Sequence, residues 1–144
     1  MSKQRAKQAV EDSYSRFLSS LKLVTIAMTE SRFRINRDAF LDEPEDVFMT
    51  LSSRTHKIAK TFFELEAKLE VKAARKKTGA GSLQLQAVYL LHIHAKPPIS
   101  KGAIKRFADE ELRLLIWPYL REYVASTCGR MHVPPIILPL PEAE

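Results

Sequence analysis

The stretch that decides the fold is TFFELEAKLEVKAARK, residues 61–76. Between residues 63 and 73 every second residue is apolar and the residues between them are charged. The apolar residues are Phe63, Leu65, Ala67, Leu69, Val71 and Ala73. Successive side chains of a β-strand point to opposite faces, so this strand has one dry and one wet face. That pattern is typical of an antiparallel sheet covered on one side only.

A second strand is predicted over residues 82–96, where Leu83, Leu85, Ala87 and further alternating apolar residues share one face. The glycine-containing segment 77–81 separates it from the first strand, so the two form a hairpin. Two more extended stretches precede them, at residues 21–37 and 47–60, and the acidic segment 38–46 connects these two.

Helices are predicted at both ends. Apolar residues at three- and four-residue steps predict an amphipathic helix over residues 3–20. After Pro97 and Pro98, Ser100 is expected to cap a helix to about residue 108 and Asp109 a second one to about residue 129. Pro118 is expected to kink this helix or lengthen its first turn, and Gly129 to end it.

The predicted elements are therefore a helix, four strands, two helices and an apolar, proline-rich tail. Because strands and helices are segregated along the chain, the fold class is α+β. We expect an N-terminal helical arm over residues 1–20 and one domain over residues 21–144.

The 144 residues carry a formal net charge of +6. Residues 54–77 hold eight lysines and arginines against three glutamates, a local excess of five positive charges. Such a stretch attracts an acidic partner, which can be nucleic acid, an acidic peptide or another face of its own oligomer. The alternative interpretation is a solvated sheet face.

The single cysteine, Cys128, excludes an intramolecular disulfide and fits a reducing compartment. The polar N-terminal sequence does not resemble a signal peptide, and no apolar run is long enough to cross a membrane. We therefore expect a cytoplasmic protein.

No catalytic constellation is present, so the chain is not expected to be an enzyme or to need a cofactor. His92 and His94 share a strand face but lack the further ligands of a closed zinc site. Cys128 and His132 are spaced like a nucleophile pair, but a lone helical cysteine beside an apolar tail is more often buried and inert.

Residues 112–141, LRLLIWPYLREYVASTCGRMHVPPIILPLP, resemble the SecB family of protein-export chaperones. The resemblance depends most on an aromatic-Pro-Tyr-x-Arg-Glu run, followed by Arg130 and an exit through Val133 and Pro134. The motif positions, to which a structural role is assigned, are Trp117, Pro118, Tyr119, Arg121, Glu122, Arg130 and Pro134.

This resemblance implies a four-stranded antiparallel sheet with helices packed on one face, to which this chain adds its N-terminal helix. It also implies a homotetramer and a chaperone that holds non-native polypeptides in apolar grooves without ATP. The clients implied are secretory precursors, delivered to the translocation ATPase SecA, or an antitoxin.

Three departures from the export type favour the SecB-like chaperones of toxin–antitoxin systems, which protect an antitoxin. The chain is basic where SecA docks on an acidic sheet face. It ends soon after Pro141, without the expected long C-terminal helix, and it carries the N-terminal helix. Tyr123 and the Pro134–Pro135 pair are also similar to that branch.

For a chaperone, client contacts are expected on apolar residues near loops and helix edges, about half of which would be core. The candidates are Phe40, Leu41, Phe48, Ile99, Ile104, Phe107, Trp117, Val133, Ile136 and Ile137. A nucleic-acid-binding module is the alternative of another class. It is less favoured because no aromatic residues interleave with the basic residues 72–77 to stack bases.

Overall fold

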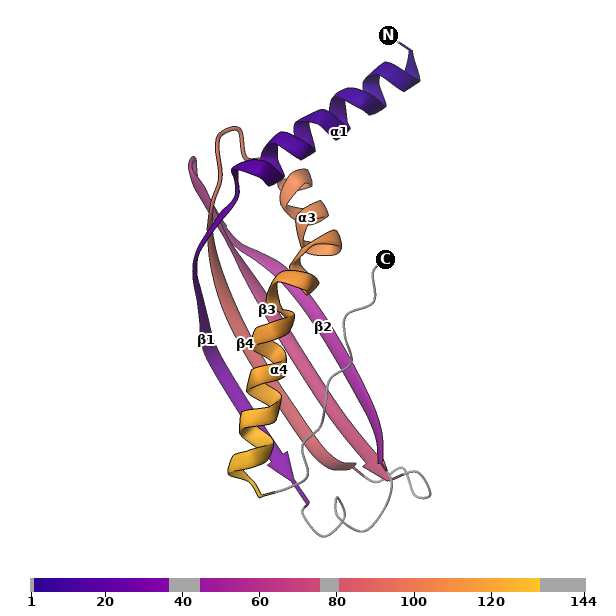
Figure 1. Ribbon diagram of the computed structural model, residues 1–144, viewed down its shortest axis with the longest axis vertical. Helices are drawn as coiled ribbons and strands as arrows, with labels where there is room; N and C mark the ends of the chain where they lie inside the picture. The colour runs from indigo at the N-terminus through magenta and orange to yellow at the C-terminus, as the bar shows by residue number, and fades with distance from the viewer. Residues whose placement is uncertain (1, 37–44, 76–80, 133–144) are drawn as a thin grey trace.

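The computed structural model describes residues 2–36, 45–75 and 81–132. The described chain forms four strands and three helices (Figure 1). In chain order they are α1 (Lys3–Ser20), β1 (Lys22–Ile35), β2 (Glu45–Ile58), β3 (Phe62–Arg75), β4 (Gly81–His94), α3 (Lys101–Glu110) and α4 (Leu112–Arg130). The predicted α+β class and the predicted order of helices and strands are confirmed, and the predicted apolar tail lies outside the described residues.

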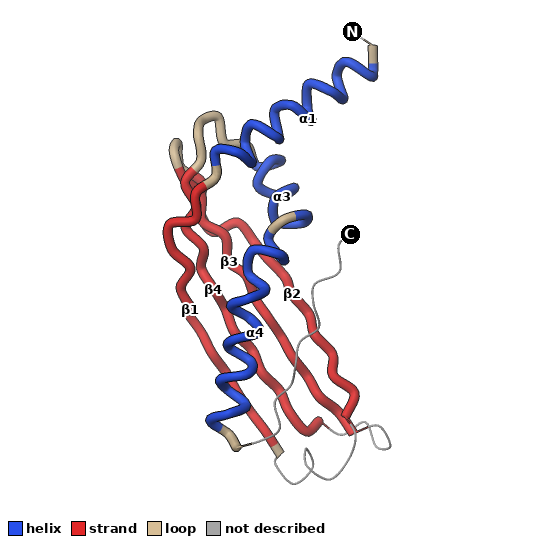
Figure 2. Tube along the Cα trace, viewed as in Figure 1, coloured by secondary structure: helices blue, strands red, loops and turns tan. Residues whose placement is uncertain are grey.

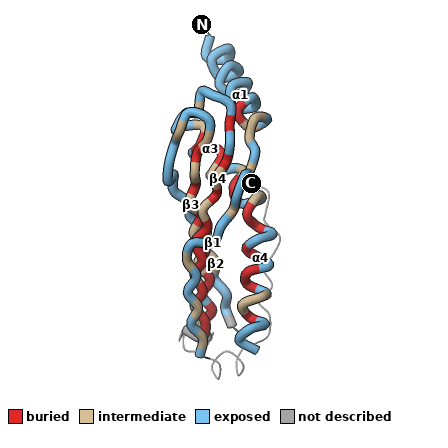
Figure 3. Tube along the Cα trace, turned by 90° about the vertical axis from the view of Figure 1, so that its left-hand side faces the viewer, coloured by how far each residue is buried: buried red, intermediate tan, exposed pale blue. Residues whose placement is uncertain are grey.

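The four strands make one antiparallel sheet in the order β1-β4-β3-β2. Helices α3 and α4 lie across one face of this sheet (Figure 2). The other face carries no helix of the described chain (Figure 3). The strands β1 and β2 are therefore the two edges, and the hairpin strands β3 and β4 predicted from their alternation are central.

The core lies between the sheet and the helices. All six alternating apolar residues of β3 are buried, as are the corresponding residues of β4. From the helix layer, α4 contributes Leu112, Ile116, Leu120 and Val124, each almost fully buried. Because each buried aliphatic side chain stabilises the fold by about 1.5–3 kcal/mol, this single cluster supplies most of the driving force for folding.

The helix caps are partly as predicted. The Ser100 hydroxyl accepts a hydrogen bond from the backbone N–H of Ala103 at 3.1 Å, which confirms the cap of α3. The prediction that Asp109 caps the next helix is wrong. The N–H of Glu111 still donates to the carbonyl of Phe107 at 2.8 Å, so α3 continues past Asp109. Glu111 then precedes α4 without a side-chain cap.

Helix α4 continues through Pro118 and also through Gly129, which was predicted to end it. Pro118 has no N–H to donate to the carbonyl of Leu114. Leu114 lies on the exposed side of α4. The helix ends at Arg130, and His132 adopts the left-handed conformation with a φ of 53°. A non-glycine residue therefore takes the conformation that a terminal glycine usually supplies.

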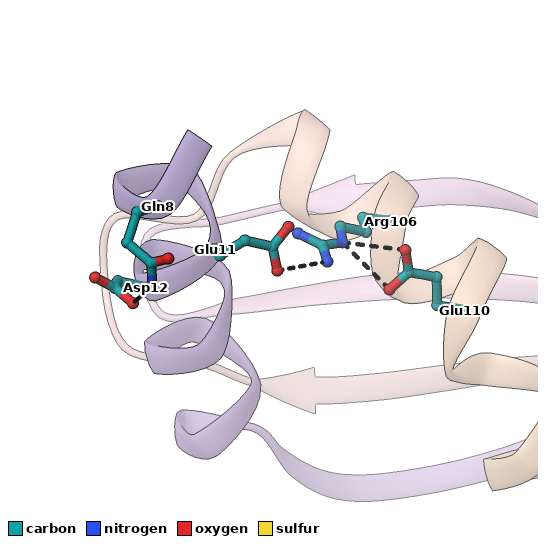
Figure 4. A network of polar contacts seen from close by, with 5 residues as sticks. All are labelled: Gln8, Glu11, Asp12, Arg106 and Glu110. Carbon is teal, nitrogen blue, oxygen red and sulfur yellow. Dashed lines mark hydrogen bonds and ion pairs between the residues drawn. The ribbon is translucent and has the colours of Figure 1, made fainter. Parts of the chain in front are cut away.

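The N-terminal helix α1 points away from the sheet at its beginning and joins the core at its end (Figure 1). Its Tyr14 and Phe17 are buried in the same cluster as the sheet residues. Arg106 of α3 pairs with Glu11 of α1 at 3.0 Å and with Glu110 at 3.1 Å (Figure 4). The hydrogen bond to Glu11 is the main cause of a raised pKa at Arg106. These contacts hold α1 against α3.

The Arg106 guanidinium lies over the Tyr14 ring, with its central carbon 3.9 Å from the ring centroid. Its hydroxyl is buried and makes no hydrogen bond to any residue of the described chain. Burial, assisted by the charges of Glu110 and Glu111, raises the pKa of Tyr14 to about 12. An unsatisfied buried hydroxyl costs free energy, while the ring contributes packing.

Tyr14→Phe is therefore expected to raise the free energy of unfolding by about 1 kcal/mol, because it deletes the unsatisfied group and keeps the ring. A folded-state pKa above the unfolded value favours the neutral phenol in the native state. The stability that native Tyr14 gains from this preference is fully present below about pH 10, and it is lost as the pH rises toward 12. Thermal melting at pH 7 and pH 11 measures both effects. A lower melting temperature at pH 7 would mean that the hydroxyl is satisfied.

Candidate functional site

The helix-facing side of β2 carries apolar side chains that the helices leave partly open. Val47, Met49 and Leu51 pair with Ala73, Val71 and Leu69 of β3, so they share a face with the core. Met49 and Leu51 are half-buried, whereas Val47 is 44% exposed. Helix α4 crosses the sheet diagonally toward β1 and leaves this part of β2 beside it (Figures 1 and 2).

The same face of β2 continues to Ile58, which is exposed and pairs with the buried Phe63. We call Val47, Met49, Leu51 and Ile58 the β2 strip. Around Ile58 a cleft of about 720 Å³ separates β2 from α3. Lys101, Lys105 and Asp109 line its polar rim on the helix side. The strip therefore joins an apolar floor to a mainly basic rim.

The strip also borders a free sheet edge. β2 pairs with β3 on one side, and no other strand of the described chain pairs with it on the other. A 14-residue edge strand presents a row of unpaired N–H and C=O groups. An extended peptide can bond to such groups while its alternate side chains contact the neighbouring apolar face.

A second cleft, of about 1090 Å³, lies between α1, α3 and the Pro97–Pro98 segment. Val10 of α1, which is largely exposed, lines this cleft together with Ser13 and Ala103. Its walls combine small apolar side chains with Arg16 and Lys96. This cleft is separate from the β2 strip.

The sequence-predicted client contacts are distributed over several environments. Ile104, Phe107 and Trp117 are buried in the core, so they cannot contact a client in this conformation. Ile99 is half-buried against the core, and Phe48 is 62% exposed. Phe48 pairs with Lys72, which places it on the sheet face opposite the helices. Phe40, Leu41, Val133, Ile136 and Ile137 lie outside the described residues.

The residues of the SecB-like motif lie along α4. Trp117 is only 3% exposed, with the Arg113 guanidinium 5.2 Å from its ring centroid. Pro118, Tyr119, Arg121, Glu122 and Arg130 are exposed on the other side of the helix, and Pro134 is outside the described chain. The structural role expected for Arg121 and Glu122 is pairing within the helix layer or across an oligomer contact. Neither residue makes an ion pair with any described residue, so only pairing across an oligomer contact stays a prediction.

Polar contacts on the helix-facing side tie α4 to the sheet. The hydroxyl of Tyr123 hydrogen-bonds the hydroxyl of Ser31 in β1. Its ring packs edge-on against Tyr89 of β4, with centroids 6.5 Å apart. Burial, with smaller effects of Tyr123 and Glu122, raises the pKa of Tyr89 to about 12. The Tyr89 phenol is therefore neutral in ordinary buffers, and its ring serves packing.

Over the described segments, no group of three histidine, cysteine or acidic residues is placed to hold a metal ion. Cys128 is fully buried and free, while His132 is exposed. Within the same segments, no helix is both long and apolar enough to span a lipid bilayer.

Sequence reasoning missed the β2 strip, although a signal was present. Val47, Met49 and Leu51 alternate with Phe48 and Thr50, which is a strand pattern with one apolar face. The sequence analysis names Phe48 among the client contacts and none of the four residues of the β2 strip. Only the register with β3 shows that Val47 lies on the helix side and Phe48 on the other.

Comparison with known proteins gave a match in structure alone. No family model and no curated protein matches the sequence. Among solved structures, the chain is similar to the SecB-like chaperone Rv1957 of Mycobacterium tuberculosis, solved with a peptide of the antitoxin HigA1. The TM-score is 0.78 with 13% identity, over 92% of this chain and 99% of that one.

A second solved structure, a protein of unknown function from Streptococcus agalactiae, matches with a TM-score of 0.47 and 9% identity, over 83% of this chain and 97% of that one. The Rv1957 match spans nearly the whole of both chains and includes the sheet and its helices. The chain therefore has the fold of the SecB-like chaperones.

Proposed function

We propose that this protein is a chaperone of the SecB-like kind, which holds non-native polypeptides along the β2 strip. The observation that carries the proposal is the juxtaposition of partly open apolar side chains with the free edge of β2. An unfolded client offers the two complementary features, which are apolar side chains and unpaired backbone groups. Burying the former contributes about 25 cal/mol per Å², and the latter can extend the sheet.

The fold supports an antitoxin as client more than a secretory precursor. The structural neighbour of this fold was solved with an antitoxin peptide. In addition, the described part of the helix-free face carries seven lysines and arginines against five acidic residues, four glutamates and Asp46, so it lacks the acidic surface expected for docking SecA. On this proposal the protein acts in the cytoplasm without ATP, cofactor or catalysis. It works as a homotetramer, in which several strips act on one client by avidity.

The test is suppression of aggregation. A chemically unfolded, unrelated protein is diluted into buffer containing this protein, without ATP, at 50 mM and at 300 mM salt. We expect suppression at near-stoichiometric amounts in both salts, because burial of apolar surface is little affected by screening. Absence of suppression at both salt concentrations would contradict a general holding activity.

The antitoxin role has its own readout. An aggregation-prone antitoxin is incubated with a protease, with and without this protein. Protection of the antitoxin together with aggregation suppression supports both parts of the proposal. Suppression without protection would support a chaperone with other clients.

A further inference from the structure

The helix-free face of the sheet gathers three aromatic rings at one end. Phe62 begins β3, and His92 and His94 end β4. The ring centroids of Phe62 and His92 are 4.5 Å apart, and those of His92 and His94 are 5.2 Å apart. Phe62 pairs in register with His94, so all three side chains lie on the same face. We call these three residues the aromatic platform.

The aromatic platform is accessible. Phe62 and His92 are half-buried and His94 is exposed. No helix of the described chain covers this face of the sheet (Figure 3). The rings therefore present open surface, on which a flat ligand can stack.

Cationic side chains surround the aromatic platform. The Lys57 ammonium lies 5.4 Å from the Phe62 ring centroid. Lys22 of β1 pairs in register with His94, which places it on the same face. Neither lysine forms an ion pair with a described residue. Glu64 is the one acidic residue among these neighbours, opposite both Lys57 and His92.

The positive charge continues along the same face. Three of its four glutamates are already in ion pairs, Glu30 with Arg32, Glu66 with Arg54 and Glu70 with Lys68. Arg34 and Lys72 remain without such a partner among the described residues. With Asp46 counted, the described part of this face holds seven basic and five acidic residues, so a chain of regularly spaced negative charges lying on it would meet an excess of two cations.

Stacking rings and surrounding cations together match single-stranded nucleic acid. Nucleobases stack on aromatic side chains, and phosphates contact lysine and arginine. Some RNA-binding domains use the same arrangement, with bases stacked on aromatic residues of a four-stranded sheet. An acidic peptide would use the cations but would leave the aromatic platform without a role. We infer that the aromatic platform, with Lys22 and Lys57, binds a short segment of single-stranded nucleic acid.

The experiment uses a fluorescein-labelled uridine 12-mer and fluorescence anisotropy, with the full-length protein at 50 mM salt. We expect binding that weakens with salt, with a slope of about −0.7 per phosphate contacted. His94→Ala and Phe62→Ala are each expected to weaken binding about fivefold or more, because each removes a stacking ring. Lys57→Gln is expected to make the salt slope shallower by about 0.7.

Phe48→Ala is the matched control. Phe48 is an exposed phenylalanine on the same face, beside Lys72, at the opposite end of the sheet. It lies about ten residues along the strands, or roughly 30 Å, from the aromatic platform. Its replacement is expected to leave binding unchanged. Because His94 is exposed, His94→Ala also separates loss of binding from loss of folding.

Three results would overturn the inference. The first is that the protein does not bind the 12-mer at 50 mM salt. The second is that His94→Ala binds it as tightly as the parent protein. The third is that Phe48→Ala weakens binding as much as His94→Ala or Phe62→Ala. A glutamate 12-mer that binds as tightly and is equally sensitive to His94→Ala would identify an acidic protein as the partner instead. The assay contains no unfolded client, so its outcome is independent of the chaperone proposal.

Discussion

Replacing Trp117 with alanine is expected to lower the free energy of unfolding by about 3–5 kcal/mol, the range for deleting a buried aromatic side chain. Trp117 is 3% exposed within the core cluster, so its removal leaves a cavity between α4 and the sheet. Denaturation in urea, followed by circular dichroism, measures the loss. Client capture is expected to fall in parallel with the folded fraction.

Trp117 is among the client contacts expected from the sequence alone, and on that basis Trp117→Ala would weaken capture more than folding. Tyr119→Ala is the control, because Tyr119 lies two residues further along α4 and is 42% exposed. Its replacement is expected to change the free energy of unfolding by less than about 0.5 kcal/mol. If Trp117→Ala kept the parent's stability but lost capture, Trp117 would be a client contact after all.

Val47→Asp combined with Ile58→Asp is expected to weaken client capture at least tenfold. The two changes place charges in the β2 strip, where a client would bury them, and an unpaired buried charge is costly. Both positions are exposed in the chain alone, so the melting temperature is expected to change little. Aggregation suppression and thermal melting on the same samples measure the two effects.

Phe48→Asp gives a matched control on the same strand. It introduces the same charge at the residue next to Val47, on the opposite face of the sheet. We expect it to leave capture intact. If Phe48→Asp reduced capture as much as the double variant, clients would bind the helix-free face, or the strand edge whichever face its side chains point to. The β2 strip would then not be the site.

The central hairpin could be read from the sequence because its pattern is local. Residues 63–73 alternate without exception, and only a strand of a one-sided sheet buries such a set. Helix α1 was predictable for the same reason, since its apolar residues recur at helical steps. The cap at Ser100 also depends on a neighbour three residues away.

Two predictions of helix ends failed where tertiary packing outweighed a local signal. Asp109 is a good cap by residue type, but the hydrogen bond from Glu111 to Phe107 keeps α3 helical beyond it. Gly129 is a good helix terminator, yet α4 continues to Arg130. In both cases packing of the helix on the core outweighs a preference of about 1 kcal/mol or less.

By itself the sequence determined the α+β class, the four strands and the apolar face of β3 and β4, because residue spacing alone encodes them. Tertiary structure alone decided which apolar residues are available to a partner. Trp117 and Val47 are both apolar, but α4 packs Trp117 against the sheet and leaves Val47 at its edge. It also brought Phe62 next to His92 and His94, some thirty residues apart in the chain. Strand register sets such proximity, and register depends on pairing between distant segments that no local pattern contains.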